Sequence, residues 1–106
     1  MAFNLKTLHA FEMTHRDAAC EIKATRPHHR AFVCVYPPLP DKNIHQWRVK
    51  RFEIPEELVR GEPYDGDLVD LQFLRVDTLE EVEQLLTSWY IDLSKFDAVW
   101  KTDYPV

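Results

Sequence analysis

Two thiols and two imidazoles gather within fifteen positions of the chain, where Cys20 and Cys34 flank the pair His28–His29. Cysteine and histidine are the usual ligands of zinc, and together they can also form a nucleophile and its base. The spacing contains neither a C-x2-C pair nor two histidines one helical turn apart. The sequence therefore predicts a polar turn between two strands, with no metal and no cofactor.

A small hydrolase or nuclease that uses this histidine pair is the alternative. Acid–base chemistry would require both imidazoles to converge with a carboxylate or with Cys34. Other catalytic patterns are weaker, because neither Ser88 nor Ser94 lies in a G-x-S-x-G turn. Two glycines in total also leave no glycine-rich phosphate loop. We therefore predict no catalytic residues.

The net charge of −5 is divided unevenly along the chain. Residues 1–50 carry eight Lys/Arg against four Asp/Glu, whereas residues 51–106 carry five against fourteen. Acidic side chains are dense from Glu53 to Glu83, where only Arg60 and Arg75 have the opposite sign. Each phosphate contact needs a cation, so nucleic acid is a poor partner for this segment, whereas a basic protein is attracted to it.

The predicted partner-binding residues are the carboxylates of this segment, together with one tyrosine as an exposed aromatic anchor. They are Glu53, Glu56, Glu57, Glu62, Tyr64, Asp65, Asp67, Asp70, Glu80, Glu81 and Glu83. The simpler interpretation of the same charges is a solvated surface that keeps the protein soluble.

The stretch 45–51, H-Q-W-R-V-K-R, is the best candidate for nucleic-acid binding, because aromatic rings can stack on bases while cations hold phosphates. Side chains alternate along a strand, however, so Trp47 and Arg48 are expected on opposite faces. A strand with a buried tryptophan and a positive outer face is the preferred interpretation, and we predict no nucleic-acid partner.

The clearest element is a helix over residues 78–90. Thr78 can cap its first turn, and Glu81, three residues on, completes a capping box. An apolar stripe at three- and four-residue spacing runs through Leu79, Val82, Leu85, Leu86 and Trp89. Because so short a helix is marginal alone in water, we expect the stripe to pack on a sheet.

Most of the remaining chain is predicted to form strands. Alternating side chains indicate strands over 3–11, 20–24, 45–54 and 68–76, the third of them near an edge. Residues 31–36, A-F-V-C-V-Y, are apolar on both faces and predict a central strand. The fold class is therefore α+β, a mostly antiparallel sheet of about 4–5 strands with one main amphipathic helix packed on one face.

At 106 residues the chain has room for a single domain, which we assign to residues 1–106. No apolar run reaches the roughly 18 residues of a membrane span. The first residues show neither a basic leader nor a continuous apolar region. The sequence therefore predicts a cytoplasmic protein without membrane contact, in which both cysteines stay reduced.

Residues 76–106 resemble the C-terminal part of small, uncharacterised bacterial proteins, some of which are similar to the immunity proteins of toxin systems. The shared elements are the capped helix closed by Trp89, the pair Phe96–Asp97 and the terminal run Asp103-Tyr104-Pro105. The resemblance implies a small acidic α+β inhibitor without catalysis, and it transfers no functional residues.

Our leading hypothesis is a non-enzymatic protein-binding module of the immunity type, which neutralises a basic toxin by covering it with an acidic surface. The hydrolase or nuclease at His28–His29 is the alternative. A third hypothesis is a structural homodimer formed through the strand over 45–54.

Overall fold

The computed structural model describes residues 2–61 and 65–105 and confirms the α+β fold. One antiparallel sheet has the strand order β4-β3-β2-β1-β5. Its strands are β1 (Ala18–Ile22), β2 (His29–Tyr36), β3 (Trp47–Pro55), β4 (Val69–Val76) and β5 (Asp97–Ala98). The helices are α1 (Leu5–His9), which continues as a π-helical turn over Ala10–Thr14, and α2 (Leu79–Ser88). Short 3-10 turns cover Pro40–Lys42, Glu56–Leu58, Asp65–Asp67, Leu93–Lys95 and Val99–Lys101.

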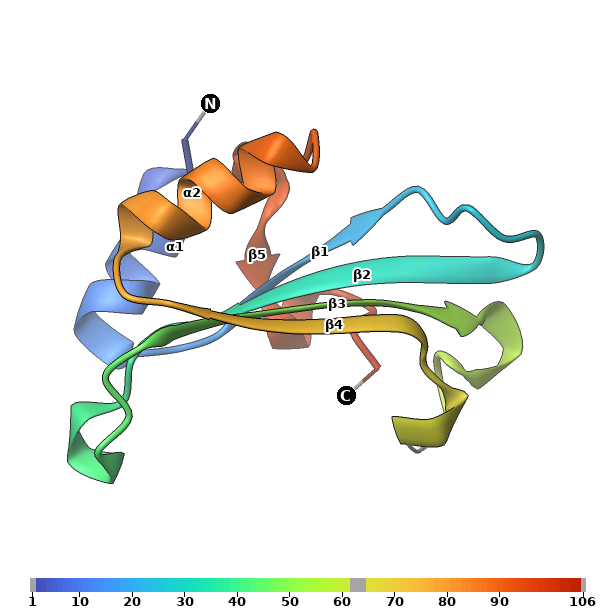
Figure 1. The fold of residues 1–106 in the computed structure, drawn as a ribbon, viewed down its shortest axis with the longest axis horizontal. Coiled ribbons are helices and arrows are strands. Elements are labelled where there is room, and N and C mark those ends of the chain that lie inside the picture. Colours follow the sequence, from blue (N-terminus) through green and yellow to red (C-terminus); the bar gives the residue numbers. More distant parts are fainter. Residues whose placement is uncertain (1, 62–64, 106) are drawn as a thin grey trace.

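Both helices lie on one side of the sheet and the C-terminal tail lies on the other (Figure 1). We call these the α2 side and the tail side. On the α2 side, Val33, Val35 and Val49 of the strands pack against the two helices. On the tail side, a second core joins Phe32 and Phe52 to the terminal segment. β2 supplies both cores because its side chains alternate, which confirms the prediction of an apolar central strand.

The helix predicted over 78–90 is α2, and its capping and packing are as expected. The Thr78 hydroxyl accepts a hydrogen bond from the Glu81 amide at 3.1 Å. Val82 and Leu86 are fully buried, and the remaining stripe residues are partly buried against the same core. No helix in the described part of the chain is both long and apolar enough to cross a bilayer.

The strand predicted over 3–11 is wrong, because this segment is helical. The Asn4 side chain caps α1 by accepting from the Thr7 amide at 2.8 Å, and its Nδ2 donates to the Phe96 carbonyl at 3.3 Å. Phe3, Thr7 and Phe11 are the buried positions. Their spacing of four residues matches one face of a helix, and the side-chain alternation that predicted a strand is weak over this short run.

β3 lies one strand in from the edge, with β2 paired along one side and β4 along the other. It therefore offers no free edge with which a strand of a second copy could pair. The free long edge belongs to β4, where Leu71 and Phe73 are exposed. A bulge in β4, with Asp70 at φ 54°, interrupts its pairing with β3. Such bulges make an edge strand less suited to pairing with another chain.

Candidate functional site

The two cysteines lie on neighbouring strands but face opposite sides of the sheet. In the pairing of β1 with β2, Ala19 stands opposite Cys34 and Cys20 stands opposite Val33. Both thiols are free and buried, Cys20 in the α2-side core and Cys34 in the tail-side core. Burial raises the pKa of Cys34 to about 12, because a thiolate is poorly solvated there. The two thiols therefore cannot share a metal ion, and burial disfavours the thiolate form of each.

The two histidines do not come together with Cys34. The side chain of His28 is 89% exposed in the loop before β2, with Nδ1 3.9 Å from Glu56 Oε1. His29 begins β2, and its Nδ1 lies 2.8 Å from the Pro27 carbonyl oxygen. Within residues 2–61 and 65–105, no three His, Cys, Asp or Glu side chains are placed to hold a metal ion. This arrangement lacks the convergence that the hydrolase alternative requires.

Glu53, the first of the predicted partner-binding carboxylates, is a buried structural residue with 8% exposure. Its Oε2 accepts from the Thr25 amide at 3.0 Å and the Thr25 hydroxyl at 2.6 Å, and its Oε1 accepts from the Arg26 amide at 3.2 Å. Burial alone would raise the pKa of Glu53, but these hydrogen bonds outweigh it and lower the pKa. Its oxygens therefore hold the loop after β1, which the sequence did not indicate.

Of the other predicted acidic residues before α2, those that the structure describes lie near the end of β3 and the start of β4. Asp70 pairs with Arg26 at 3.0 Å, and Glu56 and Glu57 are exposed on a 3-10 turn. Asp67 is half-buried at the end of its turn. Glu62, Tyr64 and the side chain of Asp65 lie outside the described residues.

The outer surface of α2 brings the last three predicted carboxylates together. Glu81 is partly engaged at the helix start, where the Thr78 hydroxyl donates to its Oε1 at 3.2 Å. Glu80 and Glu83 line a shallow hollow of about 540 Å³ on the side away from the sheet. Its remaining lining residues are Gln84, Thr87, Ser88 and Tyr90. We call this hollow with its six residues the α2 groove.

Tyr90 is the aromatic residue of the α2 groove. The sequence analysis named Tyr64 as an exposed aromatic anchor, and that residue lies outside the described part of the chain. Its side chain is 96% exposed, and its backbone is left-handed at φ 59°. The left-handed residue closes the helix, since the Ile91 amide donates to the Leu86 carbonyl at 3.1 Å. Glycine usually occupies this position because a side chain there is sterically unfavourable. The signal for Tyr90 in the sequence is its place directly after Trp89, the last residue of the apolar stripe.

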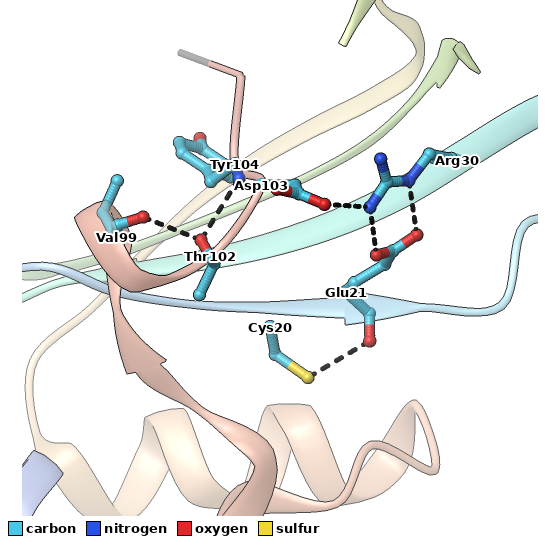
Figure 2. Close-up of polar contacts among 7 residues, drawn as sticks. All are labelled: Cys20, Glu21, Arg30, Val99, Thr102, Asp103 and Tyr104. Atoms are coloured by element: carbon cyan, nitrogen blue, oxygen red, sulfur yellow. Dashed lines mark hydrogen bonds and ion pairs between the residues drawn. The ribbon is translucent and has the colours of Figure 1, made fainter. Parts of the chain in front are cut away.

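The C-terminal tail is held on the sheet by an ionic cluster (Figure 2). Arg30 donates to both oxygens of Glu21, at 2.7 and 2.6 Å, and to Asp103 Oδ2 at 2.8 Å. The Tyr104 ring is buried beside Phe32, and its hydroxyl lies 2.9 Å from that of Tyr36. The tail is thus packed on the domain through Tyr104, and the ionic cluster beside it is structural.

The basic stretch 45–51 follows the predicted alternation. Trp47 packs edge-on against Phe11 in the α2-side core, with ring centroids 5.3 Å apart. Arg48 and Lys50 face the tail side, where their charged groups lie 5.3 and 5.5 Å from the ring centres of Tyr36 and Phe52. The tryptophan is thus unavailable for stacking on a base, whereas the cations remain at the surface.

No protein-family model, curated protein or solved structure matches the chain. The protein is thus defined by its architecture, a five-stranded antiparallel sheet covered by α1 and α2 on one side and by its own tail on the other.

Proposed function

We propose that the protein is a non-enzymatic protein-binding module whose α2 groove receives a basic segment of a partner protein. The observation that carries the proposal is Tyr90, a fully exposed aromatic side chain at the end of a hollow that two carboxylates line. Tyrosine is enriched among the residues that contribute most to binding energy, and a large exposed ring gains much by being covered.

The charges of the groove favour a cationic partner. Glu80 and Glu83 are one helical turn apart and form neither a hydrogen bond nor an ion pair with another described residue. A partner arginine can therefore donate to a free carboxylate while its guanidinium stacks on Tyr90. Neutralisation of a basic toxin in the manner of an immunity protein is the specific role that we propose, because such a module acts by covering its target.

Charge reversal in the α2 groove provides the direct test. We expect Glu80→Lys/Glu83→Lys to weaken binding of a fluorescein-labelled peptide of alternating arginine and alanine by about tenfold or more at low salt. The matched control is Glu56→Lys/Glu57→Lys, which makes the same charge change on an exposed turn elsewhere. Fluorescence anisotropy measures both affinities. Equal weakening by the two double variants would mean that peptide affinity depends only on the net charge of the protein. That result would contradict peptide binding in the α2 groove.

Tyr90→Gly is expected to separate binding from folding. Glycine relieves the left-handed backbone, so we expect the free energy of unfolding to rise by about 0.5–1 kcal/mol. The same change removes the aromatic contact, so affinity for the arginine peptide should fall about fivefold. His15→Gly is the control, since His15 is also exposed and left-handed at φ 51° but lies outside the α2 groove. Urea denaturation and anisotropy measure the two effects, and unchanged peptide affinity in Tyr90→Gly would contradict the anchor.

A further inference from the structure

Two arginines stand directly opposite each other on the tail side of the sheet. In the pairing of β3 with β4, Arg48 is the partner of Arg75, and in the adjacent row on the same side Lys50 is the partner of Phe73. Like charges at directly opposed positions of an antiparallel pair are destabilising. Unless a nearby anion offsets this repulsion, it lowers the stability of the sheet.

The described carboxylates do not neutralise the pair. Neither arginine makes an ion pair with them. Asp77, which follows β4, accepts from Gln46 Nε2 at 2.9 Å. Asp17 is half-buried, and burial raises the pKa of its carboxyl while the charge of Arg48 lowers it. Two cations therefore face each other without a direct ion pair to a described carboxylate.

Both arginines line one hollow of about 310 Å³ at this end of the sheet. The loop residues Asn43, Ile44, His45 and Gln46 complete its wall. The Arg48 guanidinium packs over Tyr36, and the Arg75 guanidinium packs over Phe73 at 5.1 Å from the ring centre. A guanidinium that stacks on a ring still has the N–H groups along its edge available for an acceptor. Arg48 uses Nη2 to donate to the Pro37 carbonyl at 3.1 Å, and its buried Nε has no partner.

We propose that this hollow, which we call the arginine pocket, binds a phosphate group between Arg48 and Arg75. A phosphate dianion balances two guanidinium charges and offers enough acceptor oxygens for both, whereas a single carboxylate balances only one. Lys50 and the 42% exposed ring of Phe73 adjoin the pocket in the next row. They add a third cation and a flat apolar surface, so a nucleotide phosphate is favoured over inorganic phosphate.

The arginine pocket and the α2 groove lie on opposite sides of the sheet, so either proposal can fail alone. Amide chemical shifts of the labelled protein, followed during titration, test the phosphate site. Inorganic phosphate is expected to shift the amides of residues 43–48 and of Arg75. Adenosine monophosphate and a short single-stranded oligonucleotide are expected to add shifts at Phe73. Shifts at 43–48 and 75 with inorganic phosphate alone would retain the site but overturn the nucleotide preference.

Arg75→Gln is the diagnostic variant, because Arg75 is exposed and its removal also relieves the repulsion. We expect it to weaken adenosine monophosphate binding about tenfold while leaving the thermal midpoint in phosphate-free, low-salt buffer unchanged or higher. Arg51→Gln is the matched control, since Arg51 lies on the α2 side and also stacks on a ring, 4.9 Å from the centre of Trp89. We expect this control to change affinity by less than about twofold. Equal weakening by the two variants, or no shifts at 43–48 and 75, would overturn the site.

Discussion

Replacing Leu86 with alanine is expected to lower the free energy of unfolding by about 3–5 kcal/mol, a large part of the 5–15 kcal/mol of a typical domain. Leu86 is fully buried where α2 meets the sheet. Its truncation removes apolar surface from the core and leaves a cavity beneath a helix that cannot persist without this contact. Urea denaturation monitored by tryptophan fluorescence measures the loss.

Thr87→Ala is the control for Leu86→Ala, because Thr87 is the next residue of α2 but faces outward into the α2 groove. We expect a change within about 0.5 kcal/mol. A loss below about 1 kcal/mol in Leu86→Ala would contradict the packing of α2 on the sheet. It would also undermine the α2 groove, since Glu80, Glu83 and Tyr90 are positioned by that packing.

Glu53→Gln is expected to cost about 2–3 kcal/mol of stability at neutral pH. An amide keeps one oxygen acceptor but turns its NH₂ group toward donors that the carboxylate now satisfies. The affected donors are the Thr25 amide and hydroxyl and the Arg26 amide. Because these groups hold the loop after β1, we expect faster hydrogen exchange in that loop as well.

The cost of Glu53→Gln is expected to depend on pH in a definite direction. Since the folded protein lowers the pKa of Glu53, the carboxylate stabilises the fold fully above its unfolded pKa of about 4.3. That contribution is lost as the pH falls through the lower folded pKa. The stability difference between wild type and variant should therefore be largest at pH 6–7 and shrink below about pH 4. Urea midpoints at several pH values measure this, with the exposed Glu57→Gln as control, and a pH-independent difference would contradict the assignment.

Several elements could be predicted because their signals are local. Thr78 and Glu81 mark the start of α2 within one turn, and the apolar stripe that follows has one clear period. The run Ala31–Tyr36 is apolar on both faces, and only a strand covered on both sides suits such a run. The strand predicted over residues 3–11 is wrong because both the alternation and the four-residue spacing of its apolar side chains are weak signals. Contacts of this segment with Phe96, far along the chain, favour the helix.

The candidate sites depended on distances that no local pattern contains. Cys20 and Cys34 looked like potential partners in the sequence, but a register offset of one residue puts them on opposite sides of the sheet. Glu53 was predicted to be a surface carboxylate, but it is buried and accepts hydrogen bonds from Thr25 and Arg26 of the loop after β1. The opposed pair Arg48–Arg75 arises from strands that are 27 residues apart at these positions, and neither segment alone indicates it.

The sequence by itself determined the fold class, the docking stripe of α2, the central strand β2 and the acidic bias of the second half of the chain. The first three follow from side-chain period and helix capping, which depend on residues close together in the chain, and the last follows from composition. Only the tertiary structure decided which charges are buried, which are opposed and which are free. Burial and register are set by long-range packing, so Glu53 is a buried structural residue, whereas Glu80, Glu83 and Tyr90 line a hollow at the surface.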